Sequence, residues 1–298
     1  MKCQIRLWEF FIELHSLYLM RYYLTASSEA VAEHRAEIIA LAEDMRVFVP
    51  EEAIERARAK WAGMPKFTRG LDVDYLDVVE GYRLWADCYD DMRNPLILVE
   101  EPIVQEILGS YRNLRVLDAA CGTGRHTAWL ARHGHRVTAL DRSPAMLGKA
   151  KEKLQAERLA ADFQLGDIMH LPYGPNRFDM VLCALAINHV ADVRGALTEF
   201  ARVLSPGGLL VISDLHPMWA VLGVGAFFFH SQGAGQVQTH ARQLSDWIDS
   251  LRSVPLELLD LREPVIDEAV ANAYPFPDMY EALRGLPIGL VFQLRKPG

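Results

Sequence analysis

Hydrophobic positions repeat with two different periods over most of the chain. Short apolar runs bounded by turn residues predict strands at 114–118, 136–140, 161–165, 178–183, 209–213, 256–261 and 288–294. Amphipathic stretches of helical period predict helices at 102–111, 125–132, 144–156, 192–204 and 240–251. Strands that alternate with helices in this way indicate βαβ units, and therefore a sheet that is mainly parallel.

The first seventy residues have a different pattern. Residues 4 to about 63 are apolar at near-helical spacing, and the Gly- and Pro-containing stretch 63–70 predicts a linker. We therefore expect a helical extension at 1–70, which serves as a lid over a pocket or as a dimer interface. The main domain is expected at 71–298.

Two segments of the main domain supply aromatic side chains. Residues 75–90 predict a helix with aromatic residues on one face, which is typical of a core stripe. Residues 221–235 are apolar, aromatic and rich in glycine. This segment is either a buried edge of the core or a mobile wall of a pocket, within an insertion at about 215–255. We favour the wall, because glycines interrupt regular structure, and such a pocket suits a small apolar or aromatic molecule.

The composition is that of a soluble globular protein. Of the residues, 51% are hydrophobic and 23% are charged. The length of 298 residues is enough for one large domain, or for one domain plus an accessory piece. The net charge of −8 argues against a nucleic-acid partner. The four cysteines show no paired spacing, which predicts neither zinc nor disulfides and indicates a reducing cytoplasm. No apolar run is long enough to span a membrane, and Glu9 and Glu13 interrupt the apolar start, so we expect no signal peptide.

The candidate chemistry begins at the first strand of the alternating region. The run 114–118 ends in Asp118, and Gly122 and Gly124 follow before the next predicted helix. Glycine in such a loop lets a ligand approach bare backbone, and the helix start presents unpaired N–H groups. Ligands bind at the carboxyl ends of the strands in open parallel sheets. The loop therefore predicts a site for a nucleotide-like ligand.

Two more acids follow the next strands. Asp141 ends the second strand and suits a ribose diol, whereas Asp167 follows the third and suits an exocyclic amine such as that of adenine. A dinucleotide is the competing ligand, since the loop begins a Gly-x-Gly pattern with an acid downstream, although Thr127 stands in the third glycine position. Asp118 disfavours the dinucleotide, because its charge would repel a pyrophosphate and suits an amino group instead. An adenosine with an amino-acid tail fits all of these positions.

With these motifs the sequence resembles the class I S-adenosylmethionine-dependent methyltransferases, over about Tyr82 to Lys296. The segments that carry the resemblance are 116–124, 140–147, 166–172, 178–181, 202–210 and the helix pattern Tyr82-x-x-Trp85-Ala86-x-x-Tyr89-Asp90. Each segment alone is weakly specific, whereas all of them in order are strongly specific. One departure is Ala120, which stands where glycine is common in the family and is expected to avoid a positive φ.

The resemblance implies a fold, a cofactor and a set of binding residues. The implied fold is α/β, a Rossmann-like seven-stranded sheet that is mostly parallel with an antiparallel last strand, flanked by helices. The implied cofactor is S-adenosyl-L-methionine, with S-adenosyl-L-homocysteine as product. Asp118 and the loop 122–124 would hold the methionine moiety. Asp141 would hold the ribose, and Asp167 with Ile168 the adenine. The implied cofactor-binding residues are Tyr82, Tyr89, Asp118, Ala120, Cys121, Gly122, Gly124, Asp141, Arg142, Met146, Asp167, Ile168 and Leu185.

Methyl transfer requires the protein to position the acceptor and, for some acceptors, to remove its proton. Histidine is a natural base near neutral pH. His216 is the first candidate for a catalytic base, because it follows the fifth predicted parallel strand, whose end is expected to face the transferable methyl. His189, after the fourth strand, is the second, with a structural capping role as its alternative. No metal is expected, since Asp214 and His216 lack further acidic ligands.

The sequence therefore predicts methyl transfer to a small, apolar or aromatic molecule, with O-methylation favoured over C- or N-methylation. An NAD(P)-dependent oxidoreductase is the competing enzyme. A non-catalytic S-adenosylmethionine-binding scaffold or regulatory protein is the alternative outside catalysis. Neither a nucleic-acid nor a membrane partner is expected, and a homodimer through the N-terminal helices stays an alternative to the lid.

Overall fold

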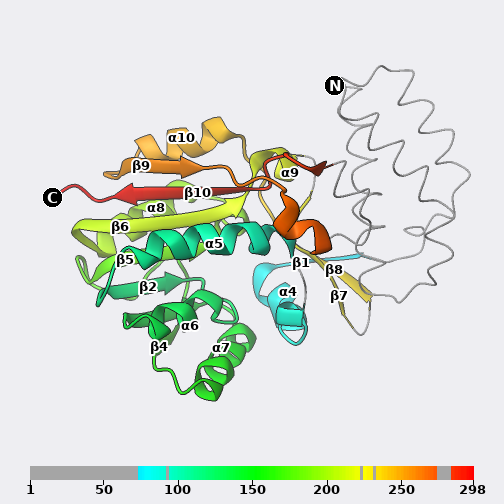
Figure 1. Cartoon of the computed structure of the whole chain (residues 1–298), viewed down its shortest axis with the longest axis horizontal. Helices are drawn as coiled ribbons and strands as arrows, with labels where there is room; N and C mark the ends of the chain where they lie inside the picture. The colour runs from blue at the N-terminus through cyan, green and yellow to red at the C-terminus, as the bar shows by residue number, and fades with distance from the viewer. Residues whose placement is uncertain (1–72, 92–93, 222–223, 231–232, 274–282) are drawn as a thin grey trace, which may run out of the picture.

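The computed structural model describes residues 73–91, 94–221, 224–230, 233–273 and 283–298 (Figure 1). The helical extension expected at 1–70, and with it the lid or dimer interface, lies outside the described residues. Strands within the described part form two sheets. The larger sheet has seven strands in the order β4-β3-β2-β5-β6-β10-β9, and the smaller has three in the order β1-β8-β7.

The larger sheet confirms the fold class predicted from the sequence. Every neighbouring pair from β4 to β6 is parallel, and β10 is antiparallel to both β6 and β9. Its strands are β2 (Arg115–Ala119), β3 (Arg136–Asp141), β4 (Asp162–Leu165), β5 (Phe178–Ala184), β6 (Leu204–Leu215), β9 (Glu257–Arg262) and β10 (Gly289–Arg295).

Helices bury both faces of this sheet. The flanking helices are α5 (Pro95–Gly109), α6 (Arg125–Arg132), α7 (Pro144–Ala156), α8 (Val193–Val203) and α10 (Leu244–Arg252). Along β5, Met180 and Leu182 pack with residues of α5 and α6, whereas the alternate residue Val181 packs with residues of α8 and α10. Because both faces are covered, consecutive positions in the middle of the central strands are apolar, which is why they appear as apolar runs in the sequence.

Helix α5 begins earlier than expected. The sequence predicted a helix from 102, whereas α5 begins at Pro95. Asn94 is its N-cap, since the Asn94 side chain accepts a hydrogen bond from the backbone N–H of Leu96. Pro102 lies inside the helix. Because proline has no N–H, it cannot donate to the carbonyl of Leu98, and Leu98 is an exposed residue.

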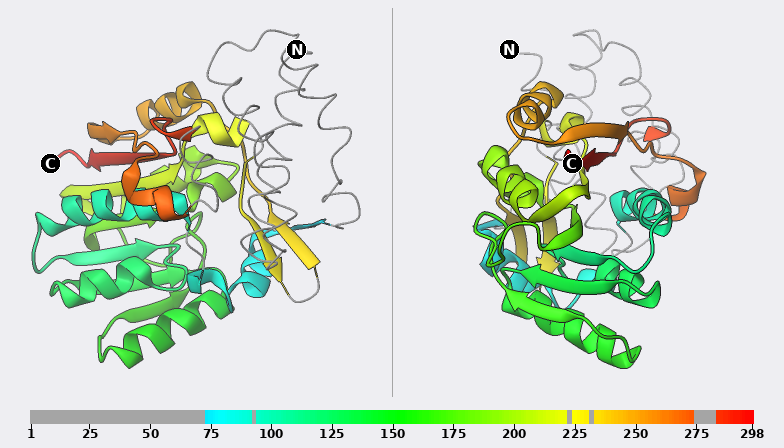
Figure 2. Two further views of the ribbon diagram at one scale, coloured as in Figure 1. Left: turned by 45° about the vertical axis from the view of Figure 1, so that its right-hand side comes forward. Right: turned by 90° about the vertical axis from the view of Figure 1, so that its left-hand side faces the viewer.

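A second, smaller unit lies beyond the carboxyl ends of the parallel strands (Figure 2). We call this unit the cap. It consists of β1 (Val73–Leu76), α4 (Val78–Trp85), the 3-10 turn η1 (Tyr89–Asp91), β7 (Phe227–His230) and β8 (Gly233–Val237).

The cap corrects the expectation of one helix over 75–90. Tyr75 and Leu76 lie in β1, which pairs in parallel with β8. Asp77 then caps α4, since its carboxylate accepts from the backbone N–H of Val79 and Glu80. The strand pairing is a tertiary contact between segments distant in the sequence, and helical periodicity carries no signal for it.

An aromatic stack holds the cap together. The Trp85 ring stacks on Phe228 with centroids 4.8 Å apart and on Tyr82 at 5.7 Å. Gly81 lets α4 approach β8 closely, because a Cβ at this position would lie 2.7 Å from a methyl of Val237. The described strands of the segment 221–235 therefore form a hairpin that packs on α4.

Candidate functional site

A cavity of about 480 Å³ lies between the carboxyl ends of the parallel strands and the cap. All of the expected cofactor-binding residues except Gly124 line it. His189 also lines it, whereas His216 does not. The residues predicted from the sequence therefore surround one cavity. They come from the ends of β2, β3, β4 and β5 and from the cap.

The loop after β2 has the left-handed backbone that its glycines permit. Gly122 has φ +56° and Gly124 has φ +78°. A Cβ on Gly122 would meet nothing within 4 Å, so its backbone faces open space. A Cβ on Gly124 would lie 2.9 Å from the Cβ of Ala150 on α7. Gly122 thus offers backbone to a ligand, whereas Gly124 permits close packing of the loop on α7.

Ala120 was expected to avoid a positive φ, and this expectation is wrong. Its φ is 61°, and it lines the cavity. The next residue explains why the conformation is kept, since Cys121 N donates to the carbonyl of Leu140 on the neighbouring strand at 2.9 Å. Leu185, at the end of β5, also lines the cavity with a positive φ of 55°. Ala120 and Leu185 are therefore two non-glycine residues in the sparsely populated left-handed region, and both line the cavity.

Asp141 ties the glycine loop to the end of β3. One carboxylate oxygen accepts from Gly122 N at 2.8 Å, and the other accepts from Ser143 N at 2.8 Å. Burial raises the pKa of Asp141, and these two backbone N–H groups oppose the rise. Each oxygen keeps a further lone pair, so the carboxylate can accept from a ligand hydroxyl as well.

Asp118 is almost completely buried beneath the loop. The hydroxyl of Thr127 donates to its carboxylate at 2.5 Å. Burial raises the pKa of Asp118, and His126 and Thr127 oppose the rise. A buried carboxylate with one hydroxyl partner attracts a cationic donor, which is the chemistry of an ammonium group.

Asp167 is the most exposed of the three acids. Its Oδ1 accepts from Met169 N at 2.9 Å, which shapes the loop after β4. Its Oδ2 lies 3.9 Å from a guanidinium nitrogen of Arg142. The buried side chains of Met146 and Ile168 also line the cavity near this loop and provide apolar surface for a flat base.

His189 connects the larger sheet to the cap. It lies in the short 3-10 turn η2 (Ile187–His189). Its Nδ1 lies 2.7 Å from the carbonyl oxygen of Gln238, which can only accept, so Nδ1 carries the proton. Nε2 then accepts from the Tyr82 hydroxyl at 2.8 Å. Burial lowers the pKa of His189 to about 4 and raises that of Tyr82 well above its ordinary value, so both groups are neutral.

His216 has a different environment. It follows β6, where its Nδ1 accepts from Met218 N at 3.2 Å and its Nε2 lies 3.0 Å from the carboxylate of Glu263. Both ring nitrogens are therefore engaged outside the cavity. Of the two candidate bases, His189 thus lies at the cavity and His216 lies outside it.

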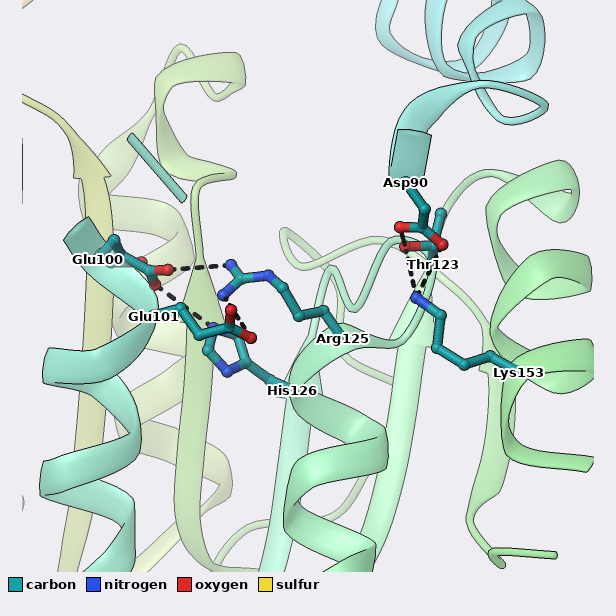
Figure 3. A network of polar contacts seen from close by, with 8 residues as sticks. Asp90, Glu100, Glu101, Thr123, Arg125, His126 and Lys153 are labelled. Atoms are coloured by element: carbon teal, nitrogen blue, oxygen red, sulfur yellow. Dashed lines mark hydrogen bonds and ion pairs between the residues drawn. The ribbon is translucent and has the colours of Figure 1, made fainter. Parts of the chain in front are cut away.

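Several cavity residues were not predicted from the sequence. Arg125 and His126, in the first turn of α6, form a buried network with Glu100 of α5 (Figure 3). Burial opposes ionisation of Glu100, but Arg125 and His126 lower its pKa to about 2. Their position directly after the glycine loop was an available signal. Gln238 and His240 also line the cavity, and no local pattern marks them.

The described residues also bear on metal and membrane binding. No group of three or more His, Cys, Asp and Glu side chains there has the arrangement of a metal site. No helix among them is long and apolar enough to cross a membrane.

Comparisons with known proteins agree with this geometry. Residues 117–212 match the family model described as a methyltransferase domain. The chain is 35% identical over 146 residues to malonyl-[acyl-carrier protein] O-methyltransferase of Yersinia pestis. The matched region covers 49% of the chain and 52% of that protein. The chain thus spans about half the length of this relative.

Two other likenesses cover more of the related protein. A demethylmenaquinone methyltransferase of Thermobifida fusca is 34% identical over 165 residues, covering 52% of the chain and 70% of that protein. The crystal structure of an S-adenosylmethionine-dependent methyltransferase from Mesorhizobium loti shares the fold, with a TM-score of 0.54 at 23% identity, over 66% of the chain and 97% of that structure. The chain therefore belongs to the class I S-adenosylmethionine-dependent methyltransferase family, which confirms the family and the cofactor, S-adenosylmethionine, that the sequence predicted.

Proposed function

We propose that the protein transfers a methyl group from S-adenosylmethionine to a small apolar or aromatic molecule, with oxygen as the first choice of acceptor atom. One observation supports this function above the others. Carboxylates from the ends of three successive strands, Asp118, Asp141 and Asp167, line one cavity together with the open backbone of Gly122. This donor set matches an ammonium group, a ribose diol and an adenine amine.

The same residues disfavour the dinucleotide alternative. A pyrophosphate bound at the start of α6 would approach the buried Asp118 and the nearby Asp141. Two carboxylates beside a dianionic group would cost free energy, and Arg125, the cation nearest in sequence to the loop, already pairs with Glu100 and Glu101. An ammonium group has the opposite effect, since it pairs with Asp118 and lowers its pKa again.

S-adenosylmethionine supplies, when bound, a methyl group already activated on a sulfonium. The protein's residues hold the reactants in line and accept a proton from the acceptor where one is lost. Tyr82 and His189 are suited to the second task, because both line the cavity and share a hydrogen bond. Nε2 of His189 can take the Tyr82 proton while Tyr82 takes one from an acceptor hydroxyl.

The nature of the acceptor is supported by the cap. Val78, Tyr82 and Tyr89 give the cavity an apolar and aromatic wall opposite the strand ends. One relative is named an O-methyltransferase, which supports oxygen as the reactive atom. The other is named for demethylmenaquinone, which supports a small-molecule acceptor.

Calorimetric titration tests the cofactor part of the proposal. We expect the wild type to bind S-adenosylmethionine and S-adenosylhomocysteine and not NAD(P). Asp141→Asn should weaken this binding by about tenfold or more, since a hydrogen bond to a charged group contributes about 1.5–3 kcal/mol. Asp162→Asn, at the amino end of β4, is the matched control. Binding of NAD(P) in place of S-adenosylmethionine would overturn the proposal.

Mass spectrometry tests the reaction. The protein is incubated with S-adenosylmethionine carrying a deuterated methyl group and with a metabolite extract. A product heavier by the labelled methyl is expected among apolar or aromatic hydroxyl compounds. Cofactor binding without any labelled product across broad extracts would favour the scaffold alternative.

A further inference from the structure

Three side chains join the cap to the glycine loop and to α7 (Figure 3). The Asp90 carboxylate, on η1, accepts from the Thr123 hydroxyl at 2.6 Å and pairs with Lys153 Nζ at 2.8 Å. Lys153 Nζ also donates to Thr123 Oγ1 at 3.3 Å. Each side chain therefore contacts the other two, although they come from three separate segments of the chain.

Thr123 is the buried member of this triangle. It lies between Gly122 and Gly124, is 2% exposed and lines the cavity. Gly124 packs directly on Ala150 of α7, about one helical turn before Lys153. The loop is therefore held from one side by α7 and from the other by Asp90.

Asp90 also neighbours a residue of the cavity wall. Tyr89 lines the cavity, and its ring packs edge-on against Trp85 with centroids 5.1 Å apart. The contact between Asp90 and Thr123 thus fixes the distance between an aromatic wall of the cap and the loop that faces it. A molecule bound between them contacts both walls.

A second ion pair between the same two helical regions provides a comparison. Asp87 pairs with Lys149 at 2.9 Å, but the Asp87 side chain is 91% exposed. The Thr123 hydroxyl is not among its partners. Exposed pairs of this kind contribute little to stability. Asp87 and Asp90 therefore separate the effect of joining the cap to α7 from the effect of holding the loop.

We propose that Asp90 is a positioning residue for the bound cofactor. Its hydrogen bonds with Thr123 and Lys153 hold the glycine loop against the cap and thereby set how long the cofactor stays in the cavity. The inference rests on the proposed function, because it takes the ligand of the loop to be S-adenosylmethionine or its product.

The test uses the full-length chain and S-adenosylhomocysteine as the probe. Stopped-flow displacement measures the dissociation rate constant, and calorimetry measures Kd. Asp90→Ala and Thr123→Val should raise both by about tenfold, which corresponds to the loss of one charge-assisted hydrogen bond. Thr123→Ser keeps the hydroxyl and should restore both to within about threefold of the wild type, and Asp87→Asn should leave them within about twofold.

The possible outcomes separate the two proposals. A wild type that does not bind S-adenosylhomocysteine overturns the proposed function and this inference with it. A wild type that binds, with dissociation unchanged in Asp90→Ala, overturns this inference alone. Equal weakening by Asp87→Asn and Asp90→Ala also overturns it, since the effect would then come from any contact between the cap and α7. If Asp90→Ala unfolds, the Thr123 variants still test the inference. Faster dissociation in Thr123→Val, together with nearly wild-type dissociation in Thr123→Ser, supports it.

Discussion

The two walls of the cavity are built in different ways. On the sheet side, two of the three acids are held by backbone N–H groups close to them: Asp141 by Gly122 and Ser143, and Asp167 by Met169. The third, Asp118, accepts from the hydroxyl of Thr127. On the cap side, aromatic side chains from segments distant in the sequence pack on one another, with Trp85 between Tyr82 and Phe228. The first wall depends on strands and their loops, and the second depends on a small satellite core.

This difference indicates how the two walls divide their work. The sheet wall is part of a large core with both faces covered, so its donor set is rigid. A rigid donor set suits the cofactor, which is the same molecule in every turnover. Among the described residues, the core of the cap has three buried side chains, Trp85, Phe228 and Val237. A unit with so few buried contacts can open locally without global unfolding, as an entrance to a cavity must.

The largest expected effect separates the stabilities of the two walls. Trp85→Ala should destabilise the cap by about 3–5 kcal/mol, the usual cost of removing a buried aromatic side chain. Because the larger sheet does not depend on it, far-UV circular dichroism should change little while binding of S-adenosylhomocysteine is lost. Trp247, stacked on Phe292 in the main core at 5.1 Å, is the matched position. Trp247→Ala should lower the global unfolding temperature, and an equal global loss in both variants would contradict the separation.

The second prediction concerns pH and the sheet side. Burial raises the pKa of Asp214, at the end of β6, from 3.8 to about 7. The folded protein therefore binds more protons than the unfolded chain between these values, and its stability falls as the pH rises through them. The penalty at pH 8 is at most roughly 4 kcal/mol, at about 1.4 kcal/mol for each pKa unit.

Asp214→Asn tests this penalty. The amide stays neutral and can still accept from Leu215 N, as the carboxylate does at 2.8 Å. Denaturant unfolding at pH 5 and pH 8 should show a larger gain in stability for the variant at pH 8. A gain that is the same at both pH values would contradict ionisation of Asp214 as its cause.

The third prediction concerns the hydrogen bond that joins the walls. His189→Gln should lower kcat by about 100-fold, within the usual range for loss of a general base, and leave the Kd for S-adenosylhomocysteine within about threefold. Tyr82→Phe should lower kcat in the same way. His216→Gln, outside the cavity, should change kcat by less than about threefold. The reverse order of the two histidine variants would assign the base to His216, the first choice from the sequence.

The smallest effect is expected at Ala120. Its left-handed conformation costs about 1–2 kcal/mol, and glycine removes that cost while losing some chain entropy on folding. Ala120→Gly should therefore change the free energy of unfolding by less than about 1 kcal/mol. Ala119→Gly, at the last residue of β2, should destabilise by about 1–2 kcal/mol, because glycine there has the entropic cost and also removes a fully buried methyl group. Denaturant titrations measure both.

The sequence by itself determined the sheet wall. Its strands are continuous apolar runs because both faces are covered, and Asp118, Asp141 and Asp167 follow those strands directly. The polar groups of this wall can therefore be predicted from short segments of sequence, because an acid at the end of a parallel strand must lie at the edge of the sheet where the strands end. This is why all of the expected cofactor residues except Gly124 line the cavity.

Only the tertiary structure decided the cap and which of the two histidines lines the cavity. The pairing of β1 with β8, the stack of Trp85 on Phe228 and the placement of Gln238 against His189 each join residues that no local period relates. Ala120 shows the same limit on a smaller scale, since its positive φ is fixed by a hydrogen bond from the next residue to another strand. Local patterns encode what a strand end presents, whereas packing between distant segments decides which side chains face it.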